Sequence, residues 1–338
     1  MRFGAFVPQG WRMDLVGISA ERQWEAMRGV AATAERAGFD SVWVYDHFHT
    51  TPLPTTEATH EAWALMAALA ATTSRVRLGQ MCTCVAYRPP AYLARVAATI
   101  DVISGGRLDM GIGAGWYEHE YAGYGYEFLA PAGRIGQLRE AIEVMKRLWT
   151  EDEVHHQGKH YRLQGAICRP RPLQQPHIPI WVAGGGEQLT LRVAARHASH
   201  TNFGGPPEEF ARRSQVLAAH CRDAGTDYEA IVRSTNLFVI CRETEREVGA
   251  VLATIKERYL QIVPEEHAER ATAMYRAMAG TPEQLIARLR AWEPAGLGYA
   301  IVYFPQAAYD TTDIEMFARE VMPAFRGGWA GRRVRERS

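Results

Sequence analysis

Short apolar runs alternate with longer amphipathic segments along the chain. The short runs are rich in β-branched and aromatic residues, whereas the longer segments, such as 21–37 and 61–72, carry alanine and leucine at helical spacing. Gly38 directly follows the first of these segments and provides a helix stop. This alternation predicts parallel strands joined by helices. The predicted strands are 2–7, 41–45, 76–82, 108–112, 178–183, 200–203, 232–241 and 299–304.

Eight strands with helical crossovers favour an α/β fold of the (β/α)8 TIM-barrel type. The alternative is an open doubly wound sheet, which usually stops near about six strands. Residues 150–179 are too long for a simple connection and predict an insertion after the fourth helix, and 264–282 form a second extension. We expect one domain over 1–325, followed by a basic tail over 326–338.

Composition and charge narrow the class of partner. The 38 basic and 38 acidic residues give a formal net charge of zero, so we expect neither a nucleic acid nor a membrane as partner. The chain opens on a strand pattern without the features of a signal peptide, and no apolar stretch approaches the ~20 residues of a spanning helix. Five scattered cysteines favour a reducing compartment. We expect a cytoplasmic enzyme with a small-molecule substrate.

Polar residues follow the second predicted strand, where a barrel places its active site. Asp46 precedes His47, and a carboxylate beside a histidine can orient and tune an imidazole for proton transfer. The spacing of His47 and His49 also suggests a metal site. The fourth and fifth strands, however, end in glycines where further ligands would be needed. We therefore predict a proton-transfer role and no metal.

Glycine-rich turns follow the fourth and fifth predicted strands. A glycine turn between a strand and a helix lets backbone N–H groups approach an anion, and the helix dipole favours a phosphate there, although tight turns need glycine as well. Cys82 and Cys84 share a face at the end of the third strand and are interpreted as small buried hydrophobes. The residues of the two turns are Gly113, Ala114 and Gly115, and Gly184, Gly185 and Gly186.

These motifs resemble the luciferase-like monooxygenase superfamily and, within it, the coenzyme F420-dependent oxidoreductases. The resemblance runs nearly end to end and implies a barrel whose mouth holds a flavin or 5-deazaflavin, with the insertion helping to cover it. The stretches that carry it are AERAGFDSVW (34–43), DHF (46–48), YRPP (87–90), ISGGRL (103–108), GIGAGW (111–116) and PIWVAGGG (179–186).

The resemblance also implies roles for individual residues. Asp46 and His47 would lie near the reactive ring, with His47 as the proton donor or acceptor that accompanies hydride transfer. A non-prolyl cis peptide at Met81–Cys82, with Thr83 nearby, would support the back of the ring. The turn Gly184, Gly185 and Gly186 would hold the phosphate, Gly113, Ala114 and Gly115 would flank the sugar-like chain, and Asn202 would join the same pocket.

The substrate expectation comes from departures from the family pattern. Sugar-phosphate dehydrogenases of the F420 branch carry an acid directly after the glycine loop, whereas this chain has Trp116, with Glu118 and Glu120 further on. Lysine occurs at only three positions. We therefore expect a hydrophobic organic substrate in a partly aromatic pocket. The aromatic candidates are Trp11, Trp116, Tyr117, Tyr121 and Tyr124.

Three functions remain in competition. The first is an F420-dependent oxidoreductase that moves a hydride between C5 of the deazaflavin and the substrate. The second is an FMN-dependent monooxygenase that uses reduced flavin and O2, because a flavin activates oxygen and a deazaflavin does not. The third is a non-catalytic F420 carrier, since a fold does not by itself establish a function. The resemblance also implies a homodimer.

Overall fold

Eight parallel strands close into a barrel in the computed structural model, which describes residues 1–326. Each strand pairs with the next around the ring, and the last pairs with the first, with Arg2 opposite Tyr299. The predicted (β/α)8 architecture and all eight predicted strands are confirmed. In order around the barrel, the strands are β1 (Arg2–Phe6), β2 (Ser41–Val44), β3 (Arg77–Gln80), β5 (Leu108–Gly113), β8 (Ile180–Ala183), β9 (His200–Asn202), β10 (Val232–Cys241) and β12 (Tyr299–Tyr303).

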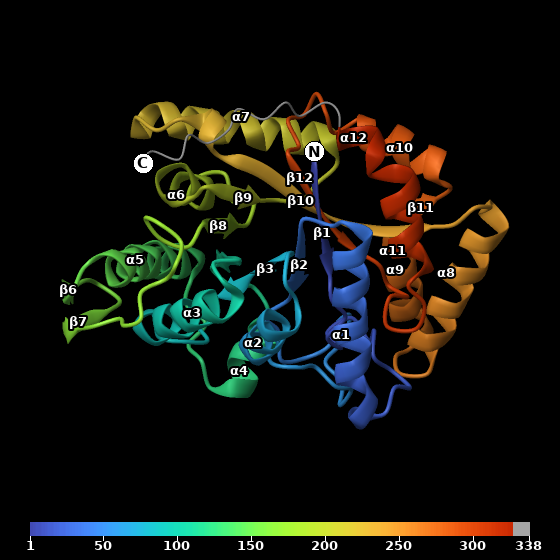
Figure 1. Ribbon diagram of the computed structural model, residues 1–338, viewed down its shortest axis with the longest axis horizontal. Helices are drawn as coiled ribbons and strands as arrows, with labels where there is room; N and C mark the ends of the chain where they lie inside the picture. Colours follow the sequence, from blue (N-terminus) through green and yellow to red (C-terminus); the bar gives the residue numbers. More distant parts are fainter. Residues whose placement is uncertain (327–338) are drawn as a thin grey trace.

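Helices cover the outside of the barrel (Figure 1). The first ends where the sequence predicts, because Gly38 adopts a left-handed φ of 87° and its N–H bonds back to the helix. The helices are α1 (Ala20–Ala37), α2 (Ala62–Thr72), α3 (Pro90–Ser104), α4 (Glu118–Tyr124), α5 (Pro131–Thr150), α6 (Thr190–His197), α7 (Pro207–Ala224), α8 (Glu245–Leu260), α9 (Glu265–Arg276), α10 (Pro282–Arg290), α11 (Thr312–Met316) and α12 (Pro323–Arg326), with η1 (Tyr228–Ala230) and η2 (Phe317–Val321).

Large aromatic side chains fill the barrel interior. The Trp43 ring lies 4.7 Å from that of Trp181, which lies 5.1 Å from that of Tyr299. Glycines on neighbouring strands make room for Trp43, since a Cβ atom would come within 2.4 Å of it at Gly4 and within 2.2 Å at Gly79. The interior is therefore packed, and a ligand has room only at the ends of the strands.

The predicted insertion contains a small antiparallel hairpin beside α5, made of β6 (Val154–Gln157) and β7 (Arg162–Ala166) (Figure 1). Glu140 on α5 anchors it by accepting hydrogen bonds from the backbone N–H groups of His160 and Tyr161. The second predicted extension contains α9 and the short strand β11 (Met278–Gly280), and another short strand, β4 (Thr83–Cys84), follows β3.

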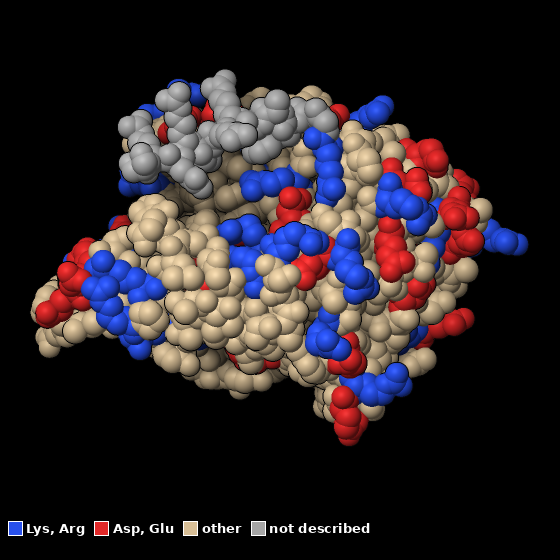
Figure 2. All heavy atoms as spheres, in the orientation of Figure 1, with Lys and Arg blue, Asp and Glu red and all other residues tan. Residues whose placement is uncertain are grey.

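Basic and acidic side chains lie close together over much of the face shown in Figure 2. The basic tail predicted over 326–338 lies outside the described residues beyond Arg326. No helix within the described range is both long enough and apolar enough to cross a membrane.

Candidate active site

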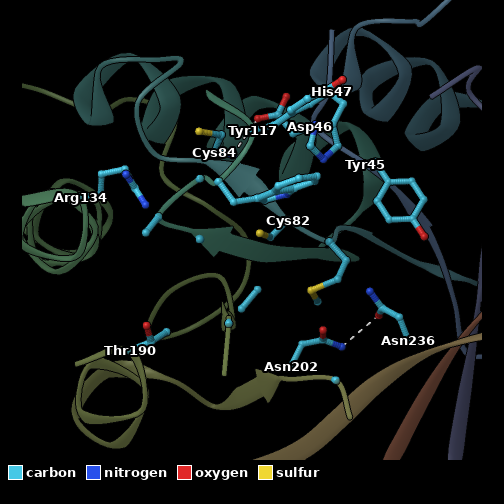
Figure 3. Close-up of a pocket in the computed structure, with 18 of the residues that line it drawn as sticks. Tyr45, Asp46, His47, Cys82, Cys84, Tyr117, Arg134, Thr190, Asn202 and Asn236 are labelled. Carbon is cyan, nitrogen blue, oxygen red and sulfur yellow. Dashed lines mark hydrogen bonds between the residues drawn. The ribbon is translucent and has the colours of Figure 1, made fainter. Parts of the chain in front are cut away.

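A cavity of about 590 Å³ opens at the carboxyl ends of the barrel strands (Figure 3). Its size is that of a cofactor or drug-sized ligand site. Most of the site residues predicted from the sequence come together around it. Those that line the cavity are Asp46, His47, Met81, Cys82, Gly113, Ala114, Gly115, Gly184 and Asn202.

Three predicted residues do not line the cavity, and their local contacts explain why. The hydroxyl of Thr83 is buried and donates to Oε1 of Gln80 at 2.6 Å. Gly185 packs against the side chain of Arg213, and the carbonyl of Gly186 accepts a hydrogen bond from Leu191 in the first turn of α6. Of this glycine turn, only Gly184 faces the ligand space directly.

His47 is held in a defined orientation at the cavity wall. Its Nδ1 lies 2.9 Å from Oε2 of Glu120, a carboxylate that is completely buried at the start of α4. The face of the imidazole stacks on Trp11, with ring centroids 4.1 Å apart and planes inclined by 8°. A hydrogen bond at one ring nitrogen and a stacked ring together restrict the imidazole to one position.

Glu120 is the centre of a hydrogen-bond network. Besides His47, it accepts bonds from the backbone N–H groups of Phe48 (2.7 Å) and His49 (2.9 Å) and from the Tyr87 hydroxyl (2.6 Å). Burial acts to raise the pKa of Glu120, but the hydrogen bonds from His47, the backbone and Tyr87 outweigh it, and the net pKa is lowered. The group is therefore an ionised acceptor at neutral pH.

The ionised Glu120 determines the tautomer of neutral His47. A carboxylate only accepts hydrogen bonds, so Nδ1 of His47 carries the proton that Glu120 binds. Nε2 of the neutral ring then has a free lone pair and is the nitrogen that can take up a proton. The arrangement suits a group that gives or accepts a proton at the cavity wall.

The expectation that Asp46 orients His47 is wrong. The carboxylate of Asp46 accepts hydrogen bonds from Nη1 and Nη2 of Arg88, at 2.8 and 3.0 Å, and from the backbone N–H of Cys84 at 2.8 Å. Asp46 and His47 both lie in the loop after β2 and line the same cavity. Arg88 and the Cys84 backbone take up the Asp46 carboxylate, however, so adjacency in the sequence does not pair it with the imidazole. Asp46 instead anchors the segment that follows β3.

The segment after β3 carries the predicted cis peptide between Met81 and Cys82. Cys82 is half-buried and Cys84 is buried, and both side chains line the cavity. Burial raises the pKa of Cys84 to about 12, so it is a neutral thiol, and its Sγ lies 3.1 Å from the hydroxyl of Tyr121. These features agree with the interpretation of the two cysteines as small hydrophobes.

The glycine turn after β8 fits a phosphate-bearing group. Gly184 has a φ of 123°, and a Cβ atom there would lie 3.2 Å from Cγ2 of Thr190 at the start of α6. Arg134 lies on the same side of the cavity as Thr190 (Figure 3), and its buried Nε has no hydrogen-bond partner within residues 1–326. An anion could bind here, because the start of α6, the Thr190 hydroxyl and Nε of Arg134 can all donate hydrogen bonds to it.

We expect Gly184→Ala to lower the free energy of unfolding by about 1–3 kcal/mol, because a side chain is strained at this φ. Urea denaturation measures the change. Gly204→Ala is the matched control, since Gly204 also lines the cavity but a Cβ atom there would meet nothing within 4 Å. Equal stability of the two variants would contradict the conclusion that a side chain at Gly184 strains the backbone.

The predicted aromatic pocket is correct in part. Trp11, Trp116 and Tyr117 line the cavity, and Trp116 remains 60% exposed at its mouth. Tyr121 is buried beneath the lining, whereas Tyr124 is exposed and packs on Phe48, so neither lines the cavity. His49 also lies outside the lining, with its Nδ1 2.8 Å from Nδ1 of His119.

The expectation that the insertion helps to cover the site is wrong for the described residues. No residue of 150–179 lines the cavity. The side chains at its rim come instead from the segment before α4 and from the start of α5. The residues that provide this cover are Trp116, Tyr117, Pro131, Arg134 and Ile135.

Several lining residues were not predicted. Asn236 on β10 accepts a hydrogen bond from Nδ2 of Asn202 at 3.0 Å. A polar residue at an alternate position of a mostly apolar strand is a signal that could have identified it. Arg12, Arg134 and Thr190 lie in loops or at helix starts and have no comparable signal. In residues 1–326 no group of three or more potential ligands is placed to hold a metal ion.

The chain is similar to known proteins over most of its length. An F420-dependent glucose-6-phosphate dehydrogenase of Amycolatopsis mediterranei is 28% identical over 88% of this chain and 93% of its own length. An FMNH2-dependent dimethylsulfone monooxygenase of Pseudomonas putida is 26% identical over 88% of this chain and 87% of its own. The solved structure of an F420-dependent secondary alcohol dehydrogenase with an F420-acetone adduct matches with a TM-score of 0.79 and 22% identity, over 96% of this chain and 99% of that one.

The family model for luciferase-like monooxygenases matches residues 1–298, which include every strand of the barrel except β12. The match therefore spans the whole of the cavity lining described above. The chain belongs to the luciferase-like monooxygenase family.

Proposed function

We propose that this protein is a coenzyme F420-dependent oxidoreductase that transfers a hydride between C5 of the deazaflavin and a hydrophobic organic substrate. The observation that carries the proposal is the His47–Glu120 pair in the wall of an aromatic-lined cavity. F420-dependent relatives such as the Amycolatopsis mediterranei enzyme support the choice of cofactor. His47 is the proton donor or acceptor that accompanies the hydride.

The described residues fit such a cofactor. Gly184, Thr190 and Arg134 would hold its phosphate. On this side of the cavity the glycine turn lets the backbone approach a ligand, and Nε of Arg134 is a donor without an acceptor. Met81 and Cys82 line the cavity and would contact the ring. When bound, the deazaflavin supplies the carbon that carries the hydride.

The protein's own residues divide the remaining tasks. Glu120 keeps the proton of neutral His47 on Nδ1, so that Nε2 can take a proton from the substrate or, once charged, return it. Trp11 holds the imidazole in place by stacking. Trp116 and Tyr117 stack on each other at the mouth, with ring centroids 5.1 Å apart, and form an aromatic wall against which an apolar substrate can pack.

Titration of the purified protein with F420, reduced F420 and FMN tests the proposal. We expect saturable binding of F420 and weak binding of FMN. Tight binding of FMN without binding of F420 would favour the second candidate, an FMN-dependent monooxygenase, which the Pseudomonas putida relative supports. Saturable F420 binding without turnover of enones, alcohols or imines would favour a carrier.

Two further properties belong to the same proposal. All five cysteines are free thiols, which supports a location in the reducing cytoplasm. We also propose a homodimer, and sedimentation analysis of the purified protein would decide its oligomeric state.

A further inference from the structure

Two side-chain donors beside His47 lack an acceptor. Trp11 and Arg12 lie in the loop after β1, and both line the cavity. Nε1 of Trp11 and Nε of Arg12 are buried, and neither has a hydrogen-bond partner within residues 1–326. Trp11 is only 5% exposed. Other buried donors in residues 1–326 also lack a partner, but these two line the cavity beside His47, where a ligand can bring acceptor atoms.

The charge of Arg12 is not matched by the carboxylates around it. Asp46 is bonded to Arg88, and Glu120 is bonded to His47. Asp14, two positions along the loop from Arg12, accepts bonds from the Tyr303 hydroxyl at 2.8 Å and from the backbone N–H of Gly10 at 2.7 Å. None of these bonds involves Arg12. A ligand that carries negative charge would complete the pairing.

Aromatic rings hold the Arg12 guanidinium in place. Its central carbon lies 4.4 Å from the ring centroid of Trp11 and 4.4 Å from that of Phe238. Tyr45 and Tyr303 lie at 5.8 Å. Ring faces attract the cation without pairing its N–H groups, and the guanidinium also makes a side-chain hydrogen bond with Tyr45. Nε still has no partner within residues 1–326 and stays available for an acceptor.

The position of the donor pair separates it from the phosphate side of the cavity. Arg12 contacts Tyr45, and Figure 3 shows Tyr45 on the side opposite Arg134 and Thr190. The Trp11 ring that contacts Arg12 also stacks on His47. An acceptor held by this donor pair would therefore lie next to the proton-transfer group.

We propose that Trp11 and Arg12 bind the carboxylate group of the substrate, and that the substrate is an organic carboxylate with an apolar body. This inference rests on the proposed function and narrows its substrate class. A single arginine in an aromatic setting matches one negative charge, and the two unpartnered donors, Nε of Arg12 and Nε1 of Trp11, match the two oxygens of a carboxylate.

Calorimetric titration with cinnamate and its neutral counterpart cinnamamide tests the inference. We expect the wild-type protein to bind cinnamate about 10- to 100-fold more tightly, both alone and when saturated with F420. Arg12→Met should remove this preference, and Arg12→Lys, which retains the charge, should restore part of it. The melting temperature and near-UV circular dichroism of each variant verify the fold.

Arg134→Met is the matched control on the opposite side of the cavity. We expect it to weaken F420 binding and to retain the preference for cinnamate. Three results would overturn the inference: equal or undetectable binding of both compounds by the wild-type protein, a preference that persists in folded Arg12→Met, or a loss of F420 affinity in that variant. A wild-type protein that does not bind F420 at all would instead overturn the proposed function.

Discussion

Replacing His47 with glutamine is expected to lower kcat by about 10²- to 10⁴-fold, the usual contribution of a positioned acid or base. Glutamine can still hydrogen-bond to Glu120 and stack on Trp11, but its amide neither gains nor loses a proton as an acid or base near neutral pH. The affinity for F420 should change little, because the residues that we propose to hold the phosphate lie elsewhere in the cavity. Steady-state kinetics with the best substrate from the panel measure the first effect, and fluorescence titration measures the second.

His49→Gln is the matched control for this experiment. His49 lies two positions further along the same loop, but it pairs with His119 and does not line the cavity. Its replacement should leave kcat within about threefold of the wild-type value, as a surface substitution away from the site would. A His47→Gln protein that binds F420 and keeps the wild-type rate across the pH range would refute the catalytic role of His47.

Removing the carboxylate of Glu120 should cause the largest loss of stability. Glu120→Ala leaves donors from His47, Phe48, His49 and Tyr87 without their acceptor in a buried site. We expect the free energy of unfolding to fall by about 3–5 kcal/mol, as when one partner of a buried charged pair is removed. Urea denaturation measures the loss. Glu118→Ala, on an exposed position of the same helix, should change stability by less than about 0.5 kcal/mol.

Glu120→Gln separates the catalytic effect from the structural one. The amide has nearly the shape of the carboxylate, so one oxygen can still accept from the backbone of Phe48 and His49. Its NH2 group would donate to Nδ1 of His47 and move the imidazole proton to Nε2. We expect a rate loss of about 10²-fold or more in a folded protein. A wild-type rate in this variant would show that Glu120 has only a structural role.

The pH dependence of stability follows from the same carboxylate. The folded-state pKa of Glu120 lies below its ordinary value of 4.5, so the unfolded chain binds the proton more readily than the folded one. The contribution of Glu120 to stability is therefore present above about pH 4.5 and is lost as the pH falls through the lower, folded-state pKa. Glu120→Gln, which cannot titrate, should show a shallower loss of stability over this acid range.

The local pattern of residues was enough to predict the barrel and the edge that carries the site. Apolar runs and helical segments alternate with distinct periods, and glycines mark the turns after β5 and β8, so each prediction depends only on residues close together in the chain. The same holds for His47 and Gly184, because the carboxyl ends of all barrel strands meet at one edge.

The partner of His47 could not be predicted in this way. Glu120 is 73 positions away from His47, and the adjacent carboxylate of Asp46 was the nearer candidate in sequence. The structure reverses this choice, because Arg88 takes up the Asp46 carboxylate and the first turn of α4 brings Glu120 against the loop after β2. The sequence by itself determined the fold and the edge of the barrel at which the cavity and His47 lie. Only the tertiary structure decided which carboxylate orients His47 and which donors, on Trp11 and Arg12, remain for a ligand. The reason is that the residues around His47 are far apart in the sequence and approach one another only when the barrel closes.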